Sequence, residues 1–333
     1  MKKICLLFTV FLSFSLQAQD KFVPAPDAPG KWSYQFYTEP EKGGYRSQQN
    51  YALSSEQLKV FRTKMDEVAE ALHKNPVLLA PLGFEPTVQG SIWSDVWAIR
   101  YKTELLSKSR VLGEVVLRFC PLFRNAQGST RKNCIEVEHA DVMINSARHT
   151  TTNWENFSGL ELSEKLILSD EPQVAFIRPA IVKKWENGVT AYENNLIIIS
   201  RKPDYWIHVT AGQMFDLQIR YWTDFEKKEG NSLILDMILK DRDRFTREEL
   251  ALPAYASFES AGKVTVIPNQ QPWLRFNPAY FDPALTRTAV QLIAIRTLTN
   301  AFYQENPSTG VDYTAHFNFV RGLDPGLWLS LLD

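Results

Sequence analysis

Apolar positions in residues 54–75 recur every three or four residues, which is the spacing of one face of an α-helix. Ser54 and Gln57 form the capping-box pattern that begins many helices, and Asn75 followed by Pro76 ends the segment. The apolar positions of this segment are Leu58, Phe61, Met65, Val68 and Leu72. The pattern predicts an amphipathic helix that packs one face against a core.

A second helical pattern begins at Thr210 and ends before Gly230, which stands where a C-terminal cap belongs. Thr210 and Gln213 repeat the capping-box pattern. Most of the circumference is apolar, so Trp222 is predicted to lie in the core. Just before this helix, Trp206 and His208 alternate with Tyr205 and Ile207 in a segment expected to be a strand, so residues 201–222 are predicted to be a strand–helix junction.

Strand-like alternation of apolar and polar positions is found in several other segments. These segments are residues 95–105, 113–120, 134–144, 180–200, 262–268, 272–278 and 309–322. Asn187-Gly188 predicts a hairpin turn within the fourth of them. Residues 283–302 begin like a helix at Asp282-Pro283 but are rich in β-branched residues, so we leave helix and strand open there.

The two strands at 113–120 and 134–144 are joined by a turn-rich segment and are expected to form an antiparallel hairpin. If Cys120 faces Cys134, then Arg118 opposes Glu136 and Val116 opposes Glu138. Cross-strand neighbours are close enough for a disulfide in the first pair and an ion pair in the second. We therefore predict a Cys120–Cys134 disulfide.

This order of elements predicts an α+β fold, with antiparallel β-sheets packed with a few amphipathic helices. Residues 146–172 show the weakest pattern and are the candidate boundary. We expect a signal peptide at 1–18, an extended segment at 19–50, a helix with antiparallel strands at 51–150, and a second α+β region at 170–333. The last region is either a separate domain or continuous with the one before it.

The first residues resemble a secretory signal peptide in their order of features. Lys2 and Lys3 precede an apolar stretch that is too short to span a membrane, and the small residue Ala18 precedes Gln19. We therefore expect an exported chain, periplasmic or extracellular, that begins near Gln19 and has no transmembrane segment after processing. The export signal, Gln19 after the expected cleavage point and the general character of the sequence look like those of secreted proteins of Gram-negative bacteria.

Charge and composition narrow the function classes. Among 333 residues, 44% are hydrophobic and 23% charged, which is usual for a globular protein. Loss of residues 1–18 removes two lysines and no acidic residue, so the net charge changes from −1 to −3. Without a basic stripe, nucleic acid is not an expected partner. No cysteine or histidine spacing suggests a metal site, and no phosphate-binding glycine motif suggests a cofactor.

Catalytic signatures are sparse. Residues 258–262 lack the first glycine of the Gly-x-Ser-x-Gly nucleophile motif. Glu136 and Glu138 share one strand face, about 7 Å apart by strand rise, within the range of an acid/base pair for glycoside hydrolysis. A solvated, salt-bridged sheet face explains these residues without catalysis. Further weak candidates for catalysis are His208, at the strand–helix junction, and Asp312 and His316, on the polar side of segment 309–322.

Aromatic residues offer a route to binding, because exposed rings stack on sugars and peptides. Trp154, Trp185 and Trp273 lie beside polar or Pro-containing segments and are the candidate platforms. The expected function is therefore that of an exported binding protein, whose ligand is a glycan, a peptide or an envelope protein. Two alternatives remain: a hydrolase that acts on envelope or environmental polymers through acidic residues, and a structural interaction module of the cell envelope.

Overall fold

The structure is a computed structural model. It describes residues 22–37, 53–92, 110–135, 137–145, 176–177, 180–185, 188–192, 196–230, 233–257, 263–269, 271–297 and 314–333. The predicted signal peptide, the strand expected at 95–105 and the candidate boundary at 146–172 lie outside these ranges.

Helices and strands occur in separate runs along the chain, as is usual in an α+β fold. The strands are β1 (Val23–Pro24), β2 (Ser33–Tyr37), β3 (Phe84–Ile92), β4 (Gly113–Arg124), β5 (Thr130–Lys132), β6 (His139–Ile144), β7 (Phe176–Ile177), β8 (Ile181–Lys184), β9 (Val189–Tyr192), β10 (Leu196–Ser200), β11 (Trp206–His208), β12 (Tyr255–Ala256), β13 (Val264–Thr265), β14 (Trp273–Phe276) and β15 (Leu292–Thr297). The helices are α2 (Ser55–His73), α3 (Pro76–Leu79), α6 (Ala211–Glu229), α7 (Leu233–Arg242), α8 (Arg247–Leu250), the 3₁₀ turn η3 (Pro278–Tyr280), α9 (Thr314–Arg321) and α10 (Pro325–Leu329).

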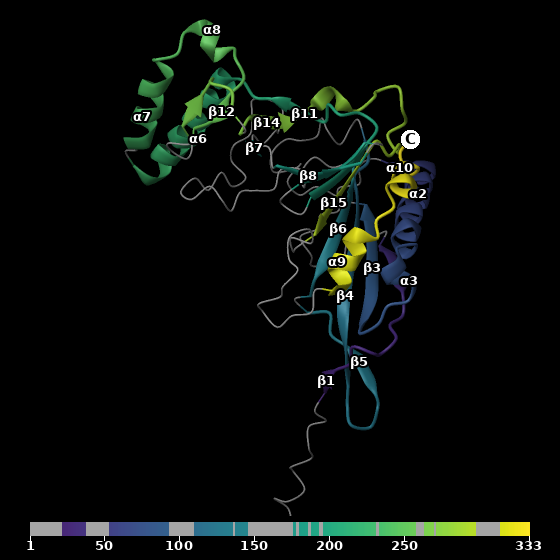
Figure 1. Ribbon diagram of the computed structural model, residues 1–333. Helices are drawn as coiled ribbons and strands as arrows, with labels where there is room; N and C mark the ends of the chain where they lie inside the picture. The colour runs from purple at the N-terminus through teal and green to yellow at the C-terminus, as the bar shows by residue number, and fades with distance from the viewer. Residues whose placement is uncertain are drawn as a thin grey trace, which may run out of the picture.

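One large sheet dominates the described part of the chain (Figure 1). Its strand order is β2-β3-β4-β6-β15-β10-β9-β8, and β1 and β5 pair with the far end of β4. Only β2 and β3 are parallel; all the other pairs are antiparallel. The predicted α+β fold with antiparallel sheets is therefore confirmed. Strands from early and late parts of the sequence meet where β6 pairs with β15.

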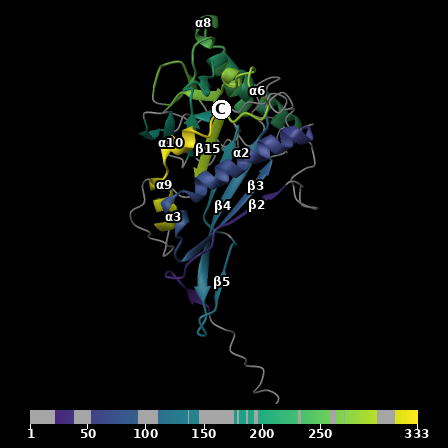
Figure 2. The ribbon, with the colours of Figure 1, turned by 90° about the vertical axis from the view of Figure 1, so that its right-hand side faces the viewer.

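Helix α2 covers one face of this sheet, as Figure 2 shows, and α9 and α10 lie on the same side. The core between helices and sheet includes Phe61 and Met65 from α2, Leu117 from β4 and Ile295 from β15, all of them fully buried. The capping box predicted at Ser54 is present, so this helix begins where the sequence indicates.

A smaller lobe packs α6, α7 and α8 against the short strands β12, β13 and β14 (Figure 1). The capping box of Thr210 with Gln213 is present, and Gly230 ends α6 with a φ of 93°. Trp222 is buried, as predicted. Strand β11 leads directly into this helix, so the predicted strand–helix junction is confirmed.

The predicted disulfide joins Cys120 to Cys134, whose Cα atoms lie 4.7 Å apart. On the loop side of the disulfide, Leu122 faces Lys132, as in the predicted register. On the other side, the register changes, and Arg118 faces His139. Three extra residues therefore lie in the second strand between the disulfide and β6.

The expected pairing of Arg118 with Glu136 and of Val116 with Glu138 is therefore wrong. Val116 faces Asp141, and Glu136 lies outside the described residues. The reason is the hydrophobic pattern, because a shift by an odd number of residues moves every side chain of a strand to the other face. The shift places Ala140, Val142 and Ile144 in the core, where the predicted register would have placed His139 and Asp141.

Segment 309–322 was predicted as a strand, and this prediction is wrong: residues 314–321 form helix α9. Ala315 and Phe319 are four residues apart and belong to the strand pattern, but this is also a helical spacing. Phe319 is fully buried and packs edge-on against Phe119 of β4, with the two ring centroids 5.8 Å apart. Tertiary packing therefore favours the helix over the strand.

Three further segments complete the comparison with the sequence. Residues 292–297, left open between helix and strand, form β15, and Asp282-Pro283 begins a turn rather than a helix. The hairpin expected near Gly188 joins β8 to β9. Strand β3 was not predicted, because Pro86 and Gly90 interrupt its pattern.

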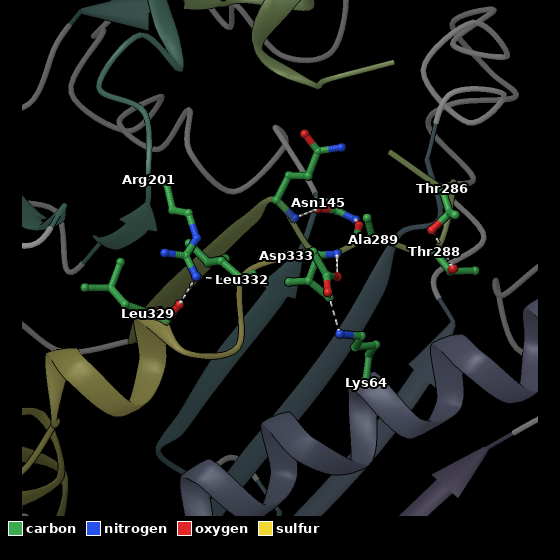
Figure 3. Close-up of polar contacts among 11 residues, drawn as sticks. Lys64, Asn145, Arg201, Thr286, Thr288, Ala289, Leu329, Leu332 and Asp333 are labelled. Carbon is green, nitrogen blue, oxygen red and sulfur yellow. Dashed lines mark hydrogen bonds and ion pairs between the residues drawn. The ribbon is translucent and has the colours of Figure 1, made fainter. Parts of the chain in front are cut away.

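Asn145 fixes the junction at the end of β6. It is fully buried with a φ of 54°, a backbone conformation that asparagine tolerates better than most residues. Its side-chain nitrogen donates to Val111 O at 3.2 Å and to Ala289 O at 2.6 Å, and Figure 3 shows the second of these contacts. Its side-chain oxygen accepts from the amides of Gln291, at 2.8 Å, and Leu292, at 3.3 Å. The side chain of Asn145 thus joins the end of β6 to two other segments, one at Val111 and one at residues 289–292.

Asp333 fastens the last helix to the same region (Figure 3). Its backbone amide donates to Val290 O at 2.8 Å, and its carboxylate accepts from Val290 N at 2.7 Å. The other carboxylate oxygen contacts Lys64 Nζ of α2 at 2.6 Å. Arg201 donates to Leu329 O at 3.2 Å and Leu332 O at 2.8 Å, so α10 is bound to the end of β10 as well.

Asn145→Ala should lower the free energy of unfolding by about 2–4 kcal/mol. The substitution removes the hydrogen-bond partner of several buried carbonyl and amide groups. Asn318→Ala, at an exposed position of α9, should change it by no more than about 0.5 kcal/mol. Urea unfolding of both variants makes the comparison. A loss below 1 kcal/mol for Asn145→Ala would show that this side chain does not hold the junction.

The pair Cys120→Ser with Cys134→Ser should lower the free energy of unfolding by about 3 kcal/mol, because the disulfide closes a loop of about fifteen residues. Denaturant unfolding of the double variant measures this, and peptide mapping without reduction should recover the two cysteine peptides joined in the native protein. Two free thiols in exported protein would contradict the disulfide and the hairpin register beside it.

Candidate functional site

The face of the sheet opposite α2 carries polar side chains on strands β3, β4, β6 and β15, among apolar ones such as Val116 and Met143. We call the following five half-buried residues the polar sheet face: Gln89, Arg118, His139, Asp141 and Arg296. Their neighbours along each strand, such as Leu117 and Ala140, point into the core on the other side. Four adjacent strands therefore present polar side chains to one surface.

The pairing of the strands places these residues side by side. Arg118 lies directly opposite His139, and Asp141 lies directly opposite Arg296. His139 and Asp141 are two residues apart on the central strand β6, so they share its face. The two arginines are on the strands that flank β6. Positively charged side chains thus stand on both sides of the single carboxyl group of this set.

Among the described residues, no carboxylate lies within ion-pair distance of either arginine. Arg118 donates to the amide oxygen of Gln89 at 2.6 Å, which is a hydrogen bond to a neutral group. Within the described ranges, Arg296 makes no hydrogen bond or ion pair through its side chain.

His139 stands against Asp141, with its Nε2 atom 3.7 Å from a carboxylate oxygen. The Nδ1 atom lies 3.3 Å from Val137 O. A carbonyl oxygen only accepts hydrogen bonds, so Nδ1 is the donor in this contact. The histidine therefore turns its other ring nitrogen, Nε2, toward the carboxyl group of Asp141.

Burial raises the pKa of the Asp141 carboxyl above its usual value of 3.8, and His139, Arg296 and Arg118 act in the opposite direction without cancelling the effect. Because all three of these neighbours influence Asp141, the two guanidinium groups lie within electrostatic range of the same point. A carboxyl group with a raised pKa beside a histidine is also an arrangement found in acid–base catalysis.

The same face of the sheet changes character toward β9 and β10. There, Tyr192, Tyr205 and Tyr280 pack with Trp206, and the hydroxyl groups of Tyr192 and Tyr205 bond to each other. Burial raises the pKa of Tyr280 to about 12, and its hydroxyl bonds to Ser200. These buried side chains form a second core, whereas the residues of the polar sheet face are half-buried.

The residues proposed for acid–base catalysis do not form the predicted arrangement in the structure. Glu138 is half-buried beside the start of β6, and its backbone oxygen accepts from Phe119 N at 2.9 Å. Glu136 and Asp312 lie outside the described residues, as does the side chain of His316, whose backbone is in α9. The polar stripe predicted for Asp312 and His316 rested on a strand that the structure replaces with a helix.

The remaining candidates lie away from the polar sheet face. His208 is exposed at the end of β11, with its ring 6.2 Å from that of Tyr255. Trp273 is only 1% exposed and belongs to the core of the smaller lobe, so it offers no exposed platform. Trp185 packs partly on the main core, with Lys183 Nζ 4.5 Å from its ring centre. Trp154 lies outside the described residues.

Sequence reasoning missed four of the five residues outright: His139, Asp141, Arg296 and Gln89, the last of which lies in the unpredicted strand β3. A signal for the first two was present, because the alternation that places Ile135 and Val137 on one side changes phase before Ala140. A signal for Arg296 is that it is the one charged residue in the apolar strand β15. Arg118 was assigned to the correct strand face but to the wrong partner.

Two other surface properties bear on function. No described helix is long and apolar enough to cross a membrane, and the described residues contain no group of three histidine, cysteine or acidic side chains suited to a metal ion. Helix α7 exposes Leu233 and Met237, with exposed fractions of 78% and 63%. Nothing in the described residues covers these two side chains.

Comparison of the chain with protein-family models finds no match, and neither does comparison with curated proteins or with solved structures. The function must therefore be inferred from the chemistry of the polar sheet face.

Asp141→Asn should become progressively more stable than the natural protein as the pH rises from about 3.5 to 7. A carboxyl whose pKa is raised in the folded state binds more protons folded than unfolded above pH 3.8, so its contribution to stability falls as the pH rises. Asparagine cannot ionise and avoids that loss. Urea unfolding of both proteins across this range measures the difference, and a difference that shrinks with rising pH would contradict the burial of this group.

Proposed function

We propose that this protein is an exported binding protein and that its ligand binds on the polar sheet face. The observation that carries the proposal is the set of half-buried polar side chains on four neighbouring strands, two of them arginines without a carboxylate partner at close range. Sites built on strands hold their side chains in fixed positions, which favours recognition of a specific ligand.

Export is supported by two features of the chain. The first residues carry the pattern of a signal peptide, and Cys120 and Cys134 form a disulfide, which persists in oxidising compartments such as the periplasm. The ligand classes that fit such an address are glycans, peptides and other proteins of the envelope or the surroundings.

A hydrolase is the second candidate function, and one observation favours it. Asp141 has a raised pKa and lies beside the Nε2 atom of His139, so it could act as a general acid. Binding accounts for more of the site, because acid–base chemistry on these two residues leaves the two flanking arginines without a role.

A thermal-shift screen with a panel of neutral glycans, acidic glycans and short peptides tests the proposal. A ligand of the polar sheet face should raise the melting temperature of the natural protein, because a ligand at 100 times its Kd contributes about 2.7 kcal/mol. The same ligand should have little effect on Arg118→Ala. Arg247→Ala is the matched control, because this arginine is exposed on α8 in the other lobe.

Equal shifts in the natural protein and in Arg118→Ala for every active ligand would place binding elsewhere and reject the proposal. The hydrolase candidate has its own outcome in the same set of reagents. Release of new reducing ends or peptide termini by the natural protein, lost in Asp141→Asn, would replace binding with catalysis.

A further inference from the structure

We infer that the group recognised on the polar sheet face is an oxyanion of the ligand, a carboxylate or a phosphate, bound between Arg118 and Arg296. This inference rests on the proposed function and narrows it from any ligand to an acidic one. The inference is supported by the positions of the strands that carry the two arginines and by the charge balance of the polar sheet face.

The positions of the two arginines suit a shared anion. They belong to β4 and β15, which lie on either side of β6. Neighbouring strands are about 4.8 Å apart, so these two strands are roughly 10 Å apart. An anion above β6 therefore lies between the two guanidinium groups, and both already act on the carboxyl group of Asp141 on that strand.

The charge balance of the face also favours an anion. Two guanidinium groups, which stay charged at any pH of interest, face one carboxyl group, and burial disfavours the ionised form of that carboxyl. Two further carboxyl groups lie on this side of the sheet, Glu114 on β4 beyond Val116 and Glu85 on β3, and Glu85 is paired with Lys132. Within the five residues of the polar sheet face, positive charge therefore exceeds negative charge.

The hydrogen-bond donors are suited to such a group. A guanidinium presents its N–H groups as a planar fork that matches the two oxygens of a carboxylate or a phosphate. Arg118 uses one nitrogen on the neutral amide oxygen of Gln89, a partner that fixes the side chain without cancelling its charge. Arg296 has no side-chain hydrogen bond in the described part of the chain, so its fork is free to accept an oxyanion.

The test measures melting temperature against concentration for inorganic phosphate and for glucuronate, with glucose as the neutral control and chloride used to match ionic strength. The natural protein should be stabilised by at least one of the two anions beyond the chloride series, and glucose should have no such effect. Arg118→Gln and Arg296→Gln should each weaken the apparent Kd about tenfold or more, because each removes charge-assisted hydrogen bonds.

Controls separate a specific site from a change of net charge. Arg247→Gln removes the same charge from the exposed surface of α8 and should leave the apparent Kd unchanged. Arg118→Lys keeps the charge and loses the fork, so it should bind less tightly than the natural protein and more tightly than Arg118→Gln. If one glutamine variant fails to fold, the other variant and Arg118→Lys still decide the outcome.

Two results would overturn the inference. One is the absence of any anion-specific shift in the natural protein, and the other is an equal shift in Arg118→Gln, Arg296→Gln and Arg247→Gln. A neutral ligand from the screen whose effect is lost in Arg118→Ala would keep the proposed binding function and reject the anion. A stronger effect of phosphate or of glucuronate supports the inference in either case and identifies the kind of oxyanion.

Discussion

The pairing of β6 with β15 is the interaction on which the rest of the structure depends. It joins strands β2, β3, β4 and β6 to strands β8, β9, β10 and β15, which come from the later part of the sequence. Asn145 completes this junction, since its buried side chain binds the segments that carry Val111, Ala289 and Gln291. The same pairing places Asp141 opposite Arg296, so the fold and the candidate site depend on one register.

Short-range patterns predicted short-range structure well. Capping boxes at Ser54 and Thr210 and the glycine at 230 identified the ends of α2 and α6, because each depends on contacts within a few residues. The disulfide and the adjacent hairpin register also followed from local alternation. The strand prediction for 309–322 failed because burial of Phe319 against Phe119 comes from a distant strand.

The candidate site was harder to predict than the fold, for a physical reason. Its five residues come from four strands, and only the register of long-range pairs brings them together. A three-residue change of register after Cys134 reverses the face of every later side chain in β6. Glu136 and Glu138 were therefore proposed where His139 and Asp141 lie. Arg118 could be identified because it lies on β4, which the change of register leaves unaltered.

Native-state hydrogen exchange most directly tests whether the β6–β15 junction unites the molecule. Amides of β4, β6, β15 and β10 should exchange together, with one free energy equal to that of global unfolding, because each of these strands is held between two others. Protection of β4 and β6 that persists while β15 and β10 exchange by a separate, lower-energy opening would contradict the account. The two halves would then be independent units, and a site shared between β6 and β15 could not be a rigid one.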